Sequence, residues 1–531
     1  MDDLKTKIYQ TKKNQRPKTE KHQQNGEKIK HRPKNTKIVP IGSFLIILIL
    51  LITTLYVGKP MEQLFAKAHT SVANNTGWLF ILCINCLLVF IVYLGFSKYG
   101  KIRIGGKNAK PEFNTTSWLS MLFSAGIGIG LLFYGVAEPI LHFNKNPFSA
   151  GSANIETAKS AINITFLHWG IHGWAIYAVV GLAMAYFTFN KKLPLSIRSI
   201  FYPLLGDKIY GWTGNVIDII AVIATLCGLA TSLGLGAQQI NAGLSYLFNV
   251  EYSNGWQIGL IIIITFLATI SLIKGLDKGI RRLSEWNIHL ALFLLMFVLI
   301  IGPTVFLLKS FVQNIGFYFQ HFLELSFWSE SYTGLKKDTH WQNSWTIFYW
   351  AWWFAWSPFV GIFIARVSKG RTIREFIAGV LLVPTLLTFF WVSVFGGSAI
   401  YQELSGNTQI SEAVNSNIAT AIYHLLEQYP LQFFSSILTV ILICSFFITS
   451  SDSGSLVVDT ITSGGKLNAP VSQKIFWASM EGLIAIILLV GGGLTAFQTA
   501  TILTGLPFAI IIIFMCYSLH RTLKKDYEKA T

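Results

Sequence analysis

The chain has 531 residues, of which 52% are hydrophobic and only 13% are charged, and its mean hydropathy is +0.51. Soluble domains carry about 25% charged residues, so this composition argues against a soluble enzyme or a soluble binding protein. The net charge of +17 does not indicate nucleic-acid binding, because residues 1–37 alone hold twelve Lys and Arg against four Asp and Glu. The composition instead predicts an all-α membrane protein with no nucleic-acid partner.

Residues 1–37 form a basic tail with almost no apolar side chains, which predicts a disordered cytoplasmic segment. The tail is not a cleavable signal peptide, because the first apolar run begins too late and is too long. A solvated tail that fixes the orientation of the chain is the simpler interpretation. Contact with anionic membrane lipid is the alternative.

Apolar runs long enough to cross a bilayer follow the tail. Residues 38–57 and 78–96 each form a run of about 20 residues, which at about 1.5 Å per residue spans a hydrocarbon core of about 30 Å. Twelve such segments begin near residues 38, 78, 117, 162, 214, 256, 286, 345, 377, 432, 473 and 497. Their even number and the Lys and Arg in alternate short connections predict cytoplasmic termini in a cell-membrane protein. We expect a transmembrane domain over residues 38–519 and a short cytoplasmic tail over 520–531.

A glycine-rich stretch, SAGIGIGLLFYGVAEP, occupies residues 124–139 of the third segment. Gly126, Gly128 and Gly130 each weaken a helix by about 1 kcal/mol relative to alanine and expose backbone groups. Such groups must face protein or a wet cavity within the bilayer. Close helix packing through a GxxxG pair and an unwound helix around a ligand are equally compatible with this pattern.

The fourth segment carries FLHWGIHGWAIYAVVG, residues 166–181. His168 and His172 are four residues apart, but no third ligand is evident near them, so we interpret them as packing residues rather than metal ligands. Trp174 and Tyr177 share a helix face with one another. The five cysteines all fall inside predicted helices, and we therefore expect no disulfide or zinc site and no cofactor.

The eighth segment begins with WTIFYWAWWFAW, residues 345–356, in which eight of twelve side chains are aromatic. Tyr349, Trp352, Trp353 and Trp356 fall on one stripe of a helix. Tryptophan at the membrane interface explains Trp345, but Trp356 lies about 16 Å deeper along the helix. The stripe is therefore either part of the core or one wall of a binding site.

A polar cluster lies in FFITSSDSGSLVVDT, residues 446–460. Five consecutive polar side chains, Thr449 to Ser453, follow an apolar run, where they are unfavourable within a membrane unless they have a function. Hydroxyl and carbonyl oxygens coordinate monovalent cations, which makes this cluster a candidate ion site. An acidic helix cap is the alternative.

Together these segments resemble the betaine/carnitine/choline transporter family. Residues 345–376, WTIFYWAWWFAWSPFVGIFIARVSKGRTIREF, are similar to the family signature, and the glycine-rich and HWGIHGWAIYAVVG segments are similar to its other hallmarks. The resemblance runs from about residue 40 to 520. It implies a LeuT-like fold of two inverted repeats of five helices (helices 3–7 and 8–12) after two extra N-terminal helices, with substrate near the bilayer midplane.

The resemblance also implies the substrate class. A quaternary ammonium group donates no hydrogen bond, so proteins hold it against aromatic faces, at about 0.5–2 kcal/mol per contact. By similarity, we expect the following substrate-binding residues: Trp169, Trp174, Tyr177, Trp352, Trp353, Trp356, Gly126, Gly128 and Gly130. Trp353 lies at a different angle from Trp352 and is assigned to the path more than to the central site. An aspartate in place of Gly130 is typical of choline-preferring relatives, so glycine favours glycine betaine.

Sodium is the coupling ion that the resemblance implies. The first sodium site corresponds to backbone oxygens of Ser124, Ile127 and Phe446 and to the hydroxyls of Thr449 and Ser450. The second corresponds to Thr225, Tyr177, Phe359 and the position of Leu229, where a hydroxyl is expected and leucine stands; Thr231 and Ser232 lie nearby in the sequence.

The expected function is import of glycine betaine by sodium symport, and not an enzymatic reaction. Choline or carnitine transport coupled to sodium or protons, or carnitine-type exchange, remains the alternative. The resemblance further implies a homotrimer. The amphipathic residues 311–327 suit either a trimer interface or anchoring of a loop on the membrane.

Overall fold

The computed structural model describes residues 37–126, 128–148, 154–274, 281–332, 340–466 and 469–530, without the side chains of 123–126, 274, 281, 282, 284 and 530. Among these residues the only extended structure is an isolated antiparallel bridge between Arg103 and Thr372, and the rest of the regular structure is helical. The all-α expectation is therefore confirmed.

The helices of the first part of the chain are α2 (Ile38–Val57), α3 (Met61–Phe96), α4 (Thr115–Gly126), α5 (Ile129–Asn144), α6 (Ile155–Trp169), α7 (Ile171–Ala185), α8 (Tyr202–Leu205), α9 (Trp212–Phe248), α10 (Asn254–Lys274), α11 (Arg281–Ile301), α12 (Thr304–Gln320) and α13 (Phe322–Phe327). Those of the second part are α14 (Phe348–Val367), α15 (Ile373–Leu404), α16 (Gln409–Ser416), α17 (Ala421–Glu427), α18 (Gln432–Thr462) and α19 (Val471–Ala530). Short 3-10 or π turns connect several of them, and the π turn Asn343–Ile347 leads directly into α14.

Nine helical stretches in the described part of the chain are long and apolar enough to cross a membrane, and a tenth results if α11 and α12, bent by 110°, count as one span. The chain is therefore a multi-pass membrane protein. The sequence predicts twelve spans, and two features account for much of the difference. Helices α4 and α5 have only 12 and 16 residues, so neither alone is long enough to count as a membrane span. Helix α19 counts once although its backbone is non-helical at Gly492 and Gly493.

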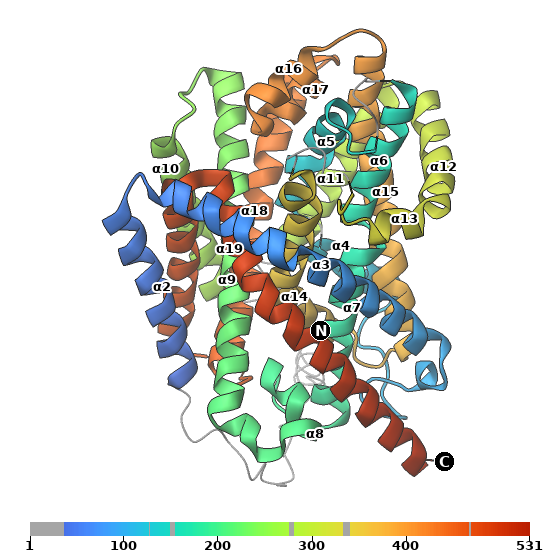
Figure 1. The fold of residues 1–531 in the computed structure, drawn as a ribbon, viewed down its shortest axis with the longest axis vertical. Coiled ribbons are helices and arrows are strands. Elements are labelled where there is room, and N and C mark those ends of the chain that lie inside the picture. Colours follow the sequence, from blue (N-terminus) through green and yellow to red (C-terminus); the bar gives the residue numbers. More distant parts are fainter. Residues whose placement is uncertain are drawn as a thin grey trace, which may run out of the picture. The chain divides into compact units, whose positions relative to one another are not determined.

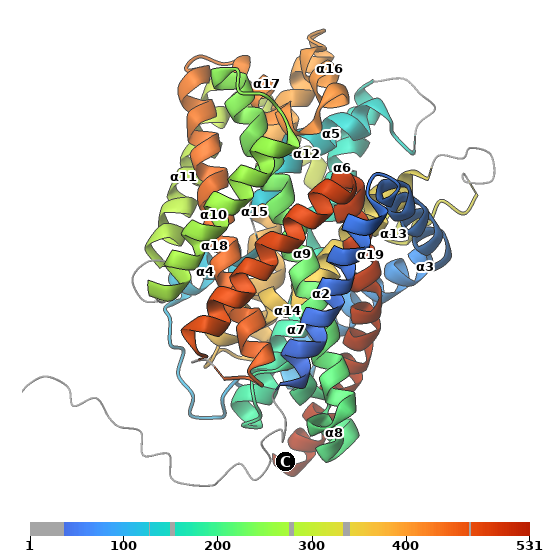
Figure 2. The same ribbon diagram turned by 90° about the vertical axis from the view of Figure 1, so that its left-hand side faces the viewer.

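The aromatic helix α14 lies in the interior of the bundle. It packs against α4, α7, α9 and α19. By contrast, α2 packs mainly on α9 and α19; it lies at the left edge of the bundle in Figure 1 and on the side that faces the viewer in Figure 2. Two helices that differ little in apolar content thus occupy very different environments.

Two interruptions in the helices position the candidate site. Between α4 and α5, Gly128 has a φ of −156° and a ψ of −143°, so the helix that the glycine-rich stretch begins does not continue through it. Between α6 and α7, Gly170 has a φ of −99° and a ψ of −143°. Of the two interpretations of the glycine-rich stretch, the structure therefore favours the interrupted helix. Backbone groups at such a break lack their helical partners and are available to other ligands.

Candidate functional site

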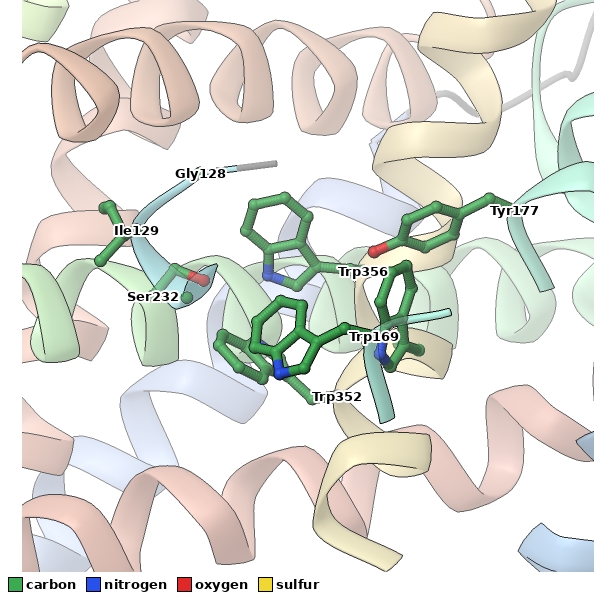
Figure 3. Close-up of a pocket in the computed structure, with 9 residues that line it drawn as sticks. Gly128, Ile129, Trp169, Tyr177, Ser232, Trp352 and Trp356 are labelled. Carbon is green, nitrogen blue, oxygen red and sulfur yellow. The ribbon is translucent and has the colours of Figure 1, made fainter. Parts of the chain in front are cut away.

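A cavity lies where these interruptions meet the aromatic stripe of α14 (Figure 3). It is lined by Gly128, Ile129, Gly130, Trp169, Tyr177, Ser232, Trp352, Trp353 and Trp356. Figure 3 shows Gly128, Ile129 and Ser232 on one side of the cavity and Tyr177 on the other, with three tryptophans between them. Five of the nine lining residues are aromatic and none is charged.

The rings around the cavity are held by contacts with each other. The centroid of Trp169 lies 6.0 Å from that of Trp352 and 6.1 Å from that of Trp353, in both cases with an edge-to-face arrangement. Tyr177 lies 4.7 Å from Trp353. A trimethylammonium group is attracted to a ring face within about 6 Å of its centroid. The cavity thus offers several such faces to one group, although Trp169 and Trp352 must move apart for a ligand to enter between them.

Glycine is required where backbone approaches these rings. A Cβ atom on Gly130 would lie 2.7 Å from ring atoms of both Trp169 and Trp352. A Cβ atom on Gly228 of α9 would lie 2.7 Å from Trp356. Distances this short do not occur for real Cβ atoms, so larger residues at these positions would displace the rings.

Hydrogen bonds fix two of the three tryptophans of α14 that line the cavity. The indole N–H of Trp352 donates to the backbone oxygen of Gly228 at 3.3 Å, and that of Trp353 donates to the backbone oxygen of His168 at 2.9 Å. The indole nitrogen of Trp356 is buried and has no partner within the described residues. It is therefore a free donor close to the cavity, available to an acceptor such as a carboxylate.

The substrate residues expected from the sequence do not all occupy the same place. Trp169, Tyr177, Trp352, Trp353, Trp356, Gly128 and Gly130 line the cavity. Trp174 is fully buried and contacts Tyr177 and Trp353 instead of the cavity. Gly126 is the last residue of α4, and its place relative to the cavity lies outside what the structure describes. Trp353 lines the same cavity as Trp352, so the two are not separated into a path and a central site.

The first sodium site falls partly outside the described residues, because these exclude Ile127 and the side chain of Ser124. What is described brings α18 to the break in the glycine-rich stretch: the Ser450 hydroxyl oxygen lies 3.8 Å from the position of a Cβ on Gly128. The Thr449 hydroxyl donates to backbone oxygens of its own helix, with Ser445 at 3.0 Å and Phe446 at 3.2 Å, and it accepts from Asn287 of α11 at 3.1 Å. Several oxygens therefore gather between α18 and the break.

The residues of the second sodium site show no comparable gathering of oxygens. The Thr225 hydroxyl donates to the Ala221 backbone oxygen at 2.7 Å, and the buried Leu229 side chain packs against Gly454. Phe359 contacts Trp356, with centroids 5.4 Å apart. Of the nearby hydroxyls, Ser232 lines the aromatic cavity, whereas Thr231 donates to the backbone oxygens of Cys227 and Phe497.

Three residues near the cavity escaped the sequence reasoning. Ile129 lines it as the first residue of α5, and Ser232 lines it from α9. Glu138 lies behind Trp169 and accepts its indole hydrogen bond at 2.8 Å. The signal for Glu138 was available, since an acidic residue inside an apolar helix is rare without a function.

The expectation that no third ligand lies near His168 was wrong. Ligand atoms of Glu138, His142 and His168 lie within 4.8 Å of one another. Glu138 and His142 are four residues apart on α5, and the packing of α5 against α6 brings His168 to them. His172 lies apart from this group, and neither of its ring nitrogens has a partner within the described residues.

Comparisons with known proteins identify the family of the chain. Residues 38–528 match the model of the family described as BCCT, betaine/carnitine/choline family transporter. The chain is 48% identical over 463 residues to glycine betaine transporter 1 of Vibrio parahaemolyticus, covering 86% of this chain and 87% of the relative. It is 46% identical over 466 residues to the glycine betaine transporter OpuD of Bacillus subtilis (88% and 90%), and 43% identical over 504 residues to a glycine betaine/proline/choline transporter of V. parahaemolyticus (91% and 89%).

These relatives bear the names of transporters, in agreement with the expectation that the chain is not an enzyme. The match covers the aromatic stripe, the interrupted helices and the polar cluster of α18 together. The chain belongs to the betaine/carnitine/choline transporter family.

Proposed function

We propose that this protein imports glycine betaine by sodium symport, with a site that opens alternately to the two sides of the membrane. The observation that carries the proposal is the cavity walled by Trp169, Tyr177, Trp352, Trp353 and Trp356. A permanently charged, methylated nitrogen is the solute group best suited to several aromatic faces, because it donates no hydrogen bond. Each face contributes about 0.5–2 kcal/mol, so three faces support an affinity useful for uptake.

The charge of the cavity favours a zwitterion over a cation. None of its lining residues is acidic, and Gly130 leaves no room for a carboxylate beside Trp169 and Trp352. Glycine betaine carries its own carboxylate, which the free indole N–H of Trp356 and the backbone groups at Gly128 can meet. The names of the relatives in V. parahaemolyticus and B. subtilis also point to glycine betaine, and one of them adds proline and choline. Choline or carnitine transport is the alternative within the family.

Sodium coupling is supported by the oxygens between α18 and the glycine break. Ser450 lies against Gly128, which itself lines the aromatic cavity. An ion bound there would hold α18 against the segment that contacts the substrate. Sodium can drive transport only if it binds the outward-open and inward-open states with different affinity, and a site between two elements that move apart meets this requirement.

We further propose twelve membrane spans in the LeuT-like arrangement of two five-helix repeats after two extra helices. Support comes from counting the interrupted pairs α4–α5 and α6–α7 as one span each and from dividing α19 at Gly492 and Gly493. The first helices of the two repeats are then α4–α5 and α14, which both line the cavity. A site built from the first helix of each repeat is typical of this architecture.

The setting of the protein follows from the same reasoning. We propose a homotrimer in the cell membrane with cytoplasmic termini. The basic residues 1–37 would lie near anionic lipid, and the bent helix α12 would be available as a contact between protomers. Crosslinking in membranes and accessibility of cysteines introduced at either end measure these properties directly.

The direct test is uptake of radiolabelled glycine betaine into proteoliposomes with an inward sodium gradient. The double variant Trp352→Ala/Trp356→Ala removes two faces and should lower uptake at micromolar substrate by about 100-fold or more. Trp256→Ala on α10 is the matched control, because that side chain is 51% exposed and far from the cavity lining. Near-normal uptake by the double variant would refute the assigned site.

Sodium coupling is tested with Thr449→Ala in the same vesicles. We expect the sodium concentration for half-maximal uptake to rise about tenfold, since a neutral ligand oxygen to a cation contributes on the order of 1–2 kcal/mol. Thr439→Ala is the control, because its hydroxyl lies on the same helix and bonds only to the Ser435 backbone oxygen at 2.8 Å. Equal uptake with sodium, potassium or an organic cation would contradict sodium symport. Competition among glycine betaine, choline and carnitine then identifies the preferred solute.

A further inference from the structure

We propose that Glu138 is a positioning residue of the substrate site: its ionised carboxylate holds the Trp169 indole from behind and makes that ring a better partner for a trimethylammonium group. The inference rests on the proposed function, because it concerns how the same cavity binds its solute. Glu138 lies on α5, one residue before Pro139, and its side chain is fully buried.

Four side chains surround the Glu138 carboxylate. On Oε2, the Trp169 indole N–H donates at 2.8 Å and the Tyr349 hydroxyl donates at 2.5 Å. On Oε1, His168 Nδ1 lies at 2.6 Å and His142 Nε2 at 3.2 Å. Trp169 comes from α6 and Tyr349 from α14, so one carboxylate ties together the helices that form the two walls of the cavity.

This arrangement fits an ionised carboxylate. The Trp169 indole can only donate, and an ionised carboxylate can only accept, with about four lone-pair positions on its two oxygens. His168 Nε2 faces the Thr346 hydroxyl at 3.0 Å, so a neutral His168 that accepts from Thr346 carries its proton on Nδ1 and donates to Glu138. With His142 protonated on Nε2 as well, four donors satisfy four acceptor positions. Within the described residues the two histidines are the only basic groups paired with Glu138.

The negative charge acts on the solute through the Trp169 ring. An acceptor on the indole N–H draws the proton and raises the electron density of the ring, which strengthens attraction of a cation to its face. In an interior from which water is largely excluded, the carboxylate also attracts the cation directly across the ring. The cavity itself has no acidic lining residue, so Glu138 supplies the nearest counter-charge without occupying space beside Gly130.

The packing behind Glu138 keeps it in this place. The His168 ring stacks on Tyr349 at 4.6 Å with an interplanar angle of 15°, and Tyr349 meets Trp169 edge-to-face at 5.3 Å. His168 also provides the backbone oxygen that accepts the Trp353 indole hydrogen bond at 2.9 Å. The Glu138 network therefore orients two of the lining tryptophans, Trp169 directly and Trp353 through His168.

A metal ion is the alternative occupant of this cluster, because Glu138, His142 and His168 present three ligand atoms to one point. The observed hydrogen bonds argue against it. His168 Nδ1 and His142 Nε2 both form hydrogen bonds with Glu138 Oε1. Glu138 Oε2 accepts hydrogen bonds from Trp169 and Tyr349. A metal ion would have to displace these hydrogen bonds, which already satisfy both carboxylate oxygens.

The experiment compares Glu138→Gln with wild-type protein in sodium-driven uptake. Glutamine keeps the size of the side chain, but it removes the charge and turns one acceptor into a donor that faces other donors. We expect KM for glycine betaine to rise about tenfold or more, with a smaller change in kcat. The matched control is Glu156→Gln at the start of α6, where the glutamate is largely exposed and pairs with Lys159. An unchanged KM in Glu138→Gln would overturn the proposal.

A double-mutant cycle separates positioning from support of the fold. Trp169→Phe keeps an aromatic face but removes the indole N–H, so Glu138 no longer accepts a hydrogen bond from the ring. If Glu138 acts chiefly through Trp169, adding Glu138→Gln to Trp169→Phe should change KM clearly less than the about tenfold change that Glu138→Gln causes alone; the remainder reports the direct attraction of the carboxylate and the contact through His168. Full additivity of the two effects would mean that Glu138 acts elsewhere, and would overturn the proposal even if Glu138→Gln alone reduces uptake.

A readout without substrate keeps this inference distinct from the proposed function. The ultraviolet resonance Raman difference spectrum between wild type and Trp169→Phe should contain the signal of a strongly hydrogen-bonded indole N–H, and Glu138→Gln should weaken it. If wild-type protein shows this signal but takes up no glycine betaine, the proposed solute is wrong. The hydrogen bond between Trp169 and Glu138 is then still supported. Absence of the signal, or one equivalent of zinc that is lost in Glu138→Gln, would overturn the inference itself.

Discussion

Helices α2 and α14 show how little the number of apolar residues alone reveals about the role of a membrane helix. In the most apolar stretch of α2, 22% of the residues are buried, whereas 89% are buried in that of the span that contains α14. Isoleucines of α2 such as Ile49 and Ile52 are more than half exposed, as expected for side chains that face lipid. The rings of α14 are instead surrounded by protein.

The difference in burial between α2 and α14 indicates which helices of such an apolar chain are candidates for a functional role. Lipid is as apolar as leucine, so a lipid-facing helix gains nothing from large aromatic residues in its middle. Tryptophan deep in a span indicates contacts with other helices or with a ligand. In α14 it indicates both, since Trp352, Trp353 and Trp356 contact neighbouring helices and also line the cavity.

The largest effect is expected where α5 approaches α14. Gly130→Val places a branched side chain 2.7 Å or less from the Trp169 and Trp352 rings, which cannot both retain their positions. We expect uptake to fall by about 100-fold or more, with normal amounts of protein in the membrane. Gly259→Val on α10 is the control, because nothing lies within 4 Å of a Cβ there. Uptake by Gly130→Val close to that of the control would break the assignment of the cavity.

A matched exchange then compares the two helices directly. Trp356→Phe keeps an aromatic face but a weaker one than that of tryptophan and removes the free indole donor, so we expect KM to rise about threefold to tenfold. Ile49→Phe on α2 places the same residue at a position that faces lipid. Its KM should stay within about 1.5-fold of the wild-type value. Initial rates over a range of glycine betaine concentrations measure both values. Equal shifts in the two variants would remove the distinction between the helices.

The smallest effect is expected for Trp174, which sequence reasoning assigned to the site and which contacts lining residues without lining the cavity. Trp174→Phe preserves most of the packing against Tyr177 and Trp353, so KM should change by less than about twofold. The thermal midpoint should fall by a few degrees, because a buried ring is replaced by a smaller one at a cost of about 1–2 kcal/mol. A large rise in KM with unchanged thermal stability would place Trp174 in the binding site after all.

The sequence predicts the parts of this site that follow from local chemistry. The alternating glycines leave an interrupted helix as one of two interpretations, and the spacing of Trp352, Trp353 and Trp356 predicts one face. The i, i+4 spacing of Glu138 and His142 is visible in the sequence, but the approach of His168 to them could not be predicted, since it depends on the packing of α5 against α6. The positions of Trp174 and Trp353 could not be predicted either, because a few tens of degrees of rotation decide whether a ring borders the cavity. The number of spans is obscured by the short helices on either side of the break.

The central claim is that a methylated ammonium group binds among the rings of α6, α7 and α14. Its most direct test is an electron cryo-microscopy structure of the protein in lipid nanodiscs with sodium and saturating glycine betaine. The account predicts density for the substrate with its quaternary nitrogen within about 6 Å of the ring centroids of Trp169, Trp352 and Trp356. Density for the substrate in the polar pocket near Asn74 and Gln342, with the aromatic rings still in contact as they are here, would contradict it.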